Sequence, residues 1–118
     1  MHEMSVAQGL LSILEQQAKA HGIARISRIR LKIGRLRGLD SRQLRLAFEA
    51  LAEGGFAANA ALDVEEIVAE ARCRACGAVW RAADYRFDCP ECAAADSEIL
   101  AGRELFIESF DGERAEPD

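Results

Sequence analysis

Four cysteines in two short pairs constrain this chain more than any other feature of its sequence. They are its only cysteines, and they stand as Cys73-x2-Cys76 and Cys89-x2-Cys92 with residues 77–88 between the pairs. Each pair makes a turn that presents two sulfurs, and the intervening loop can bring both turns to one cation. Four thiolates in a tetrahedron suit Zn²⁺, and a four-coordinate site of this kind has no open position for chemistry. The spacing therefore predicts a closed, structural zinc site.

Other uses of the cysteines fit less well. Two disulfides would need an oxidising compartment, but the chain opens with no signal-peptide pattern and has no apolar run long enough to cross a membrane. A redox pair would place a single Cys-x2-Cys beside a βαβ pattern. Iron of the rubredoxin or iron–sulfur type takes the same ligands, so the spacing leaves iron open beside zinc. We expect a cytoplasmic protein with no membrane partner.

Hydrophobic periodicity predicts two amphipathic helices. The first spans about residues 4–20, and Gly22 after Lys19 and His21 is typical of a helix C-terminus. The second begins at Asp40 or Ser41 as its cap and ends at Gly54. The apolar side chains expected to face the core are Val6, Leu10, Ile13 and Leu14 in the first helix and Leu44, Ala47, Phe48 and Leu51 in the second.

Three strands complete an α+β fold, a small sheet packed with the two helices. Residues 26–33 alternate between apolar and basic, 62–68 follow, and 104–110 return to the same sheet. A zinc-ribbon-like module interrupts this sheet in the sequence. The expected organisation is an α+β domain over 1–70 completed by the strand region 99–110, a zinc module over 71–98 and a polar tail over 111–118. Between the cysteine pairs, the aromatic residues Trp80, Tyr85 and Phe87 are expected to cover the metal site.

Charge is distributed unevenly. The net charge is −5, but residues 1–60 carry nine Lys or Arg against five Asp or Glu, whereas residues 61–118 carry six against fifteen. The acidic total opposes general phosphate binding. The basic residues between Arg25 and Arg45 are interpreted first as a solvated face balanced by acidic neighbouring strands. The functional alternative is a docking surface for an acidic protein partner.

The chain start offers a second set of metal ligands, because it reads Met1-His2-Glu3. The Met1 amine, the His2 amide nitrogen and the His2 imidazole can reach one ion, and planar nitrogen donors favour Ni(II) or Cu(II) over Zn²⁺. A histidine near a chain end is by itself more often solvated than a ligand. The helix expected to begin within a few residues, and the zinc module in the same chain, favour the metal site.

With both features in place, the sequence resembles the HypA-type nickel metallochaperones of nickel–iron hydrogenase maturation, over nearly its whole length. The residues that carry the resemblance are Met1-His2-Glu3-Met4-Ser5, Leu31-Lys-Ile-Gly34, Phe48, Gly54-Gly55, Ala71-Arg-Cys-Arg-Ala-Cys76, Cys89-Pro-Glu-Cys92 and Gly102-Arg-Glu-Leu-Phe-Ile107. The combination of the Met-His-Glu start with this cysteine spacing is specific, whereas either half alone is not.

The resemblance implies a nickel carrier and no enzyme. His2 would be the essential nickel ligand through its side chain and backbone amide, and the Met1 amine and the Glu3 backbone would complete a labile planar site. Cys73, Cys76, Cys89 and Cys92 would hold structural zinc. The implied partners are a nickel-binding GTPase and the hydrogenase large subunit, and some members of the family also serve urease.

Two segments depart from the family pattern. Ala93-Ala-Ala95 follows the last cysteine, where the family usually has a glycine, and Arg35-Leu-Arg-Gly38 is more basic than usual. The rival hypothesis is a zinc-ribbon interaction module whose basic surface contacts a protein or nucleic acid. An enzyme is the weakest class, because the chain has no cysteine beyond the zinc set and no phosphate-binding glycine loop.

Overall fold

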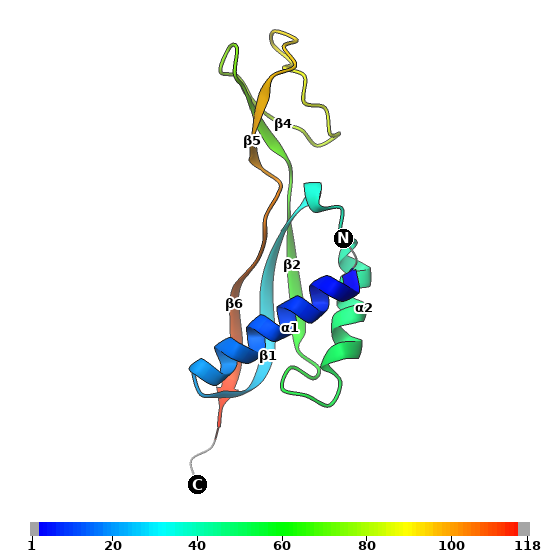
Figure 1. The fold of residues 1–118 in the computed structure, drawn as a ribbon, viewed down its shortest axis with the longest axis vertical. Coiled ribbons are helices and arrows are strands. Elements are labelled where there is room, and N and C mark those ends of the chain that lie inside the picture. Colours follow the sequence, from blue (N-terminus) through cyan, green and yellow to red (C-terminus); the bar gives the residue numbers. More distant parts are fainter. Residues whose placement is uncertain (1–2, 116–118) are drawn as a thin grey trace. The chain divides into compact units, whose positions relative to one another are not determined.

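The computed structural model describes residues 3–115 (Figure 1). In chain order, the elements are α1 (Glu3–Ala20), β1 (Ile23–Gly34), a 3₁₀ helix (Arg35–Arg37), α2 (Ser41–Ala52), β2 (Ala61–Ile67), β3 (Glu70–Cys73), β4 (Val79–Arg81), β5 (Ser97–Ala101) and β6 (Leu105–Arg114). The predicted α+β class is confirmed: two helices accompany a three-stranded sheet, and the four cysteines lie in a separate small module.

The strands form two sheets, in the orders β2-β1-β6 and β4-β3-β5. The first contains the three predicted strands. Its β1 and β6 run antiparallel, since Gly34 donates to the carbonyl of Glu104 at one end and Ala115 donates to that of Gly22 at the other. The second sheet was not predicted. In it β3 is the central strand and pairs antiparallel with both β4 and β5.

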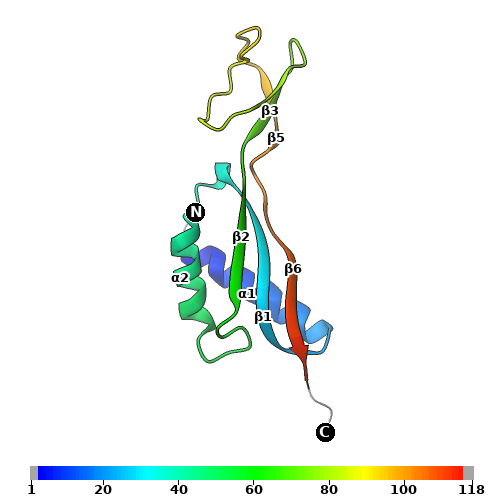
Figure 2. The same ribbon diagram turned by 180° about the vertical axis from the view of Figure 1, so that it is seen from behind.

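Helix α1 begins one residue earlier than expected and buries most of its predicted stripe. Val6, Leu10 and Leu14 are buried, but Ile13 is 50% exposed, so its place in the core is a wrong prediction. Gly22 adopts a φ of +68° after the last turn, which is the left-handed conformation expected at a helix C-terminus. Figures 1 and 2 show α1 crossing one face of the first sheet.

Helix α2 starts at a predicted cap. The side chain of Asp40 accepts hydrogen bonds from the backbone N–H groups of Arg42 and Gln43, at 2.9 and 3.3 Å, which satisfies two donors at the helix start. Leu44 and Phe48 are almost fully buried. Leu51 is 38% exposed, in disagreement with the predicted stripe.

Strands β1 and β6 are longer than the sequence pattern indicated. In β1 the expected apolar face is confirmed, because Ile29, Leu31 and Ile33 are buried. Strand β6 continues to Arg114, four residues into the range predicted as a polar tail. The strand passes close to β1 there: a side chain added at Gly112 would collide with the carbonyl oxygen of Arg25.

The chain divides into two compact units. Unit 1 comprises Met1–Leu31, Leu39–Glu65 and Phe106–Asp118, and unit 2 comprises Lys32–Gly38 and Glu66–Leu105. The six most deeply buried large apolar side chains of unit 1 are Leu14, Ile26, Ile29, Leu31, Leu44 and Phe48. In unit 2 the backbones of Gly34 and Gly102 touch, and a side chain at Gly34 would overlap the carbonyl group of Gly102.

Candidate metal centre

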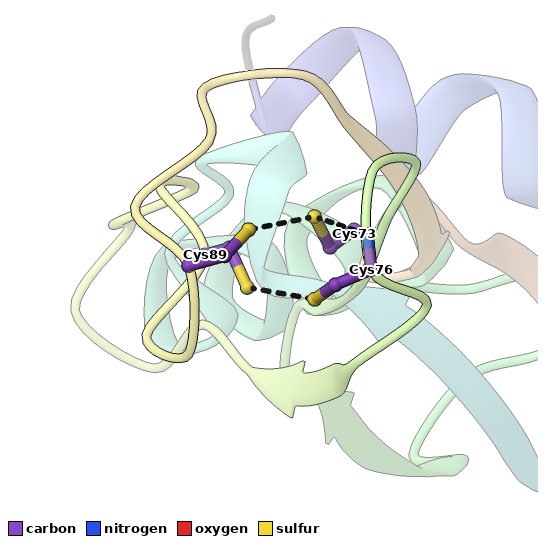
Figure 3. A group of neighbouring side chains, drawn as sticks. Cys73, Cys76 and Cys89 are labelled. Atoms are coloured by element: carbon purple, nitrogen blue, oxygen red, sulfur yellow. Dashed lines mark hydrogen bonds between the residues drawn. The ribbon is translucent and has the colours of Figure 1, made fainter.

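The four cysteines come together at one end of the second sheet. Their Sγ atoms all lie within 4.8 Å of one another (Figure 3). The Sγ atoms of Cys73 and Cys92 are 3.6 Å apart, and so are those of Cys76 and Cys89. A tetrahedral zinc ion with Zn–S bonds of about 2.3 Å separates its sulfurs by about 3.8 Å, so the cluster has the size that zinc requires. Among residues 3–115, this is the one cluster of at least three potential metal ligands.

The first cysteine turn is built on a strand. Cys73 ends β3, and its N–H donates to the carbonyl of Ala78 at 2.8 Å, while Gly77 N–H donates back to the carbonyl of Cys73 at 2.9 Å. The N–H of Cys76 also points to the sulfur of Cys73, at 3.4 Å. Gly77 has a φ of +80°, which a glycine adopts without steric cost. The first turn therefore forms both backbone hydrogen bonds and has a glycine at its left-handed position.

The second turn repeats the two backbone–backbone bonds of the first, but an alanine stands where the first turn has Gly77. Cys89 N–H donates to the carbonyl of Ala94 at 2.9 Å, and Ala93 N–H donates to the carbonyl of Cys89 at 2.8 Å. Glu91 N–H points to the sulfur of Cys89 at 3.4 Å. Ala93 corresponds to Gly77 and has a φ of +63°. The departure from the family glycine thus falls on a left-handed backbone position.

Without a metal, the crowded thiols hold their protons unequally. Backbone N–H groups, above all that of Cys76, lower the pKa of the Cys73 thiol to about 7. For Cys76 the N–H of Ala78 acts to lower the pKa, but the neighbouring thiols and burial outweigh it and raise the pKa to about 12. The pKa of Cys92 is raised in the same way, against the N–H of Ala94. Metal binding at this cluster must therefore release protons, so its affinity falls as the pH falls.

Few apolar side chains are buried in the region around the cysteines. Within residues 66–105, the buried apolar side chains are those of Ala69, Ala71, Cys73, Ala82 and Cys89. Trp80 is half-buried and donates from Nε1 to the carbonyl of Arg86 at 3.2 Å. Tyr85 is 56% exposed, so its burial does not support the prediction that it covers the metal site. Alanines bury little apolar surface, so a metal bound by the four cysteines would add substantially to the stability of this segment.

At the chain start, the structure describes Glu3, whereas the expected ligands Met1 and His2 lie outside the described residues. Glu3 is the first residue of α1 and is half-buried. Its carboxylate accepts a hydrogen bond from the backbone N–H of Asp40 at 3.2 Å. Because Asp40 also caps α2, this bond joins the starts of the two helices. Nothing in the sequence indicated the contact, since the two residues are 37 positions apart.

The chain matches the model of one protein family over residues 1–112, described as "Hydrogenase/urease nickel incorporation, metallochaperone, hypA". The chain belongs to the HypA family. The resemblance drawn from the Met-His-Glu start and the cysteine spacing is therefore confirmed, and so is the function: HypA proteins are metallochaperones that incorporate nickel into hydrogenase and urease.

Relatives and solved structures agree with this assignment. A hydrogenase maturation factor HypA of Chlorobium limicola is 42% identical over 110 residues, which make up 93% of this chain and 95% of the relative. The HypA of Rhodobacter capsulatus is 35% identical over 94% of the chain and 98% of the relative. The solution structure of the nickel metallochaperone HypA from Helicobacter pylori superposes with a TM-score of 0.70 at 29% identity, covering 98% of this chain and all of the other.

The basic face of this HypA chain is engaged by its own acidic residues. Arg28 pairs with Asp63 on β2 at 2.6 Å, and Arg30 pairs with Asp111 on β6 at 2.9 Å. Other arginines donate to backbone carbonyls: Arg45 to Leu62 at 3.0 Å and Arg37 to Arg103 at 2.7 Å. These contacts favour the interpretation as a balanced, solvated face. The rival hypothesis of a zinc-ribbon module with a basic docking surface is not favoured. Over residues 3–115, no helix is long and apolar enough to cross a membrane.

Proposed function

We propose that this HypA protein binds Ni(II) at its chain start, with His2 as the essential ligand, and passes the ion on for hydrogenase maturation. The Met1 amine and the Glu3 backbone would complete the ligand set. The family match that begins at residue 1 carries the proposal, because it includes the Met-His-Glu segment. The bond from Asp40 to the Glu3 carboxylate supports it further, since it fixes the residue from which the nickel-binding segment extends.

This ligand set suits a carrier. A planar site made of amine, amide and imidazole nitrogens is open on both sides, so a ligand of the acceptor can attack while a ligand of the carrier leaves. Coordination by the His2 amide requires loss of its proton, and nickel binding should therefore weaken on acidification. The site binds and releases the ion and leaves it chemically unchanged, which is the behaviour of a carrier and not of an enzyme.

The four cysteines would hold zinc as a structural ion. Their separations fit tetrahedral zinc, and four sulfur ligands leave no position for water or substrate. When bound, zinc would link the two cysteine turns across a segment whose buried side chains are small. Thiolate ligands persist in a reducing compartment, and we therefore assign the protein to the cytoplasm.

Nickel titration of untagged protein tests the nickel site, and the chain offers a matched control because its only other histidine is His21. His2→Ala should abolish tight nickel binding and leave the zinc content and circular dichroism unchanged. His21→Ala, in an exposed residue just after α1, should bind nickel like the wild type. A His2→Ala variant with wild-type nickel affinity and stoichiometry would refute the assignment.

Extra residues placed before Met1 test the amine separately, because they convert it to an amide. The extended protein should lose the absorption of planar nickel in the visible range, although His2 is intact. An unchanged spectrum would remove the amine from the ligand set and leave His2 in place.

We further propose that a nickel-binding GTPase accepts the ion and that the hydrogenase large subunit receives it in the end. Chromatographic separation after mixing nickel-loaded HypA with the purified GTPase of the same organism would measure the transfer. Nickel should move to the GTPase faster from HypA than from an equal concentration of free nickel–histidine complex. Equal rates would remove the GTPase from the proposal.

A further inference from the structure

The two cysteine turns have the same backbone–backbone hydrogen bonds but differ in backbone strain. In each turn the N–H of the first cysteine donates to the carbonyl five residues ahead, and its carbonyl accepts from the N–H four residues ahead, with all four distances between 2.8 and 2.9 Å. The residue after each pair is left-handed, with a φ of +80° at Gly77 and +63° at Ala93. A left-handed conformation costs an alanine roughly 1–2 kcal/mol and costs a glycine almost nothing. The strain therefore lies in the second turn.

The surroundings of the two turns also indicate that the first turn is held more firmly than the second. Cys73 belongs to β3, the central strand of its sheet, and its neighbour Arg74 bonds to Asp96 both through the backbone, at 3.1 Å, and through the side chains, at 3.2 Å. Cys89 lies outside every helix and strand. The segment leading to it contains Tyr85 at a φ of +62°, a second strained position. Among residues 3–115, Asn59 is the one further non-glycine residue with positive φ, and asparagine tolerates that conformation.

We propose that the metal site opens from its second turn, and that Cys92 is the first cysteine to leave the bound ion. Opening this turn lets Ala93 return to a relaxed backbone conformation, whereas opening the first turn relieves no strain at Gly77 and disturbs the end of β3. The inference rests on the proposed zinc role. The inference adds the order in which the cysteines release the ion: Cys73 and Cys76 retain it while an incoming ligand takes the position of Cys92.

Exposure does not account for the expected order, because the chain supplies a matched comparison. Cys76 and Cys92 are the second cysteines of their turns and both are exposed, whereas Cys73 and Cys89 are both buried. A difference in reactivity between Cys76 and Cys92 in the zinc-bound protein therefore reports how easily each turn opens. Their intrinsic reactivities can be measured separately in metal-free protein unfolded in denaturant.

The experiment is timed alkylation of full-length, zinc-bound protein with N-ethylmaleimide, followed by mass spectrometry of the four cysteine peptides. The thiolate sulfur adds to the maleimide double bond, and the adjacent carbon takes a proton from water. After correction for intrinsic reactivity, Cys92 should be modified about fivefold faster than Cys76, the ratio that corresponds to the lower end of the left-handed cost. Zinc release to a colorimetric chelator should follow the modification of Cys92.

Two single substitutions test the role of backbone strain: one removes it from the second turn, and the other introduces it into the first. Ala93→Gly should slow the alkylation of Cys92 and the release of zinc by about fivefold and leave Cys76 unchanged. Gly77→Ala should speed the alkylation of Cys76, and a Cβ there would meet no atom within 4 Å, so the change acts on the backbone alone.

Metal analysis separates the possible failures. If the wild type binds one zinc per chain but Cys76 reacts as fast as Cys92, or if Ala93→Gly leaves the rate at Cys92 unchanged, the inference is overturned and the zinc role stands. If the wild-type protein binds no zinc at all, the zinc role and the inference both fail.

Discussion

The two units of this chain are stabilised in different ways. Unit 1 buries large apolar side chains from α1, α2 and β1, with Leu14, Leu44 and Phe48 among them at no more than 1% exposure. Unit 2 buries Ile33 of β1, but between Glu66 and Leu105 its buried apolar side chains are only three alanines and two cysteines. Buried apolar area grows with side-chain size, so the hydrophobic effect stabilises the cysteine region much less than unit 1. We therefore expect unit 1 to keep its form without metal and the cysteine region to need one.

The largest expected effect follows from removing that ion. Structural zinc contributes on the order of 10–16 kcal/mol to small cysteine modules at neutral pH, far more than a cluster of alanines can supply. Stripping zinc with a chelator should unfold residues 69–101 and leave α1 and α2 intact. Amide hydrogen exchange would show loss of protection in that segment alone.

A variant that lacks one of the four cysteines provides the control for this test. Cys73→Ser should give the same pattern without any chelator, because it removes the buried ligand at the end of β3. Persistent protection of residues 69–101 in fully metal-free protein would break the contrast between the two units.

The next effect in size concerns the apolar core of unit 1. Phe48→Ala should lower the free energy of unfolding by about 3–5 kcal/mol, because the ring is 1% exposed and its removal leaves a cavity. Urea denaturation followed by the helical circular dichroism signal measures the loss. Zinc content should not change.

Leu46→Ala is the matched control, two residues away on the same helix. Leu46 is 61% exposed, and its truncation should change stability by less than about 0.5 kcal/mol. If Leu46→Ala costs as much as Phe48→Ala, the core of unit 1 does not lie where the burial indicates.

The same contrast explains which parts of the molecule the sequence predicted. The helices α1 and α2 and the strand β1 were predictable because their signals are local. Gly22 marks the end of α1, Asp40 caps α2, and apolar residues alternate from Ile29 to Ile33 in β1. The gathering of the four cysteines followed from their spacing alone, because a Cys-x2-Cys turn brings its two sulfurs together. Both predictions depend on signals that lie within a few residues of one another.

Other features have no local signal. Strands β3, β4 and β5 are three to five residues long, too short to show a period, and they form only where they pair. The Glu3–Asp40 bond depends on how two helices meet. The exposure of Ile13 and Leu51 shows the limit of periodicity, because a helical stripe is wider than the surface that packs against it. The left-handed backbone of Ala93 became visible only by comparison with Gly77.

The smallest expected effect lies on the charged face of the sheet in unit 1. The hydrogen bond from Arg30, with the charge of that guanidinium, lowers the pKa of Asp111. A lowered carboxyl pKa stabilises the folded state above the pKa of the unfolded chain, and this contribution is lost as the pH falls through the folded value. The pair is 41% and 55% exposed, so solvent screens most of its strength.

Carboxyl-detected NMR titration of Asp111 measures this effect directly. Arg30→Gln should raise the pKa of Asp111 toward its ordinary value, and Arg86→Gln, in the other unit, should not move it. The midpoint of urea unfolding at neutral pH should scarcely change in either variant, because the stability of unit 1 resides in its apolar core. A large loss of stability in Arg30→Gln would mean that the charged face stabilises unit 1 as much as its apolar core does. The comparison of the two units would then have to include ion pairs as a third source of stability, beside apolar burial and metal binding.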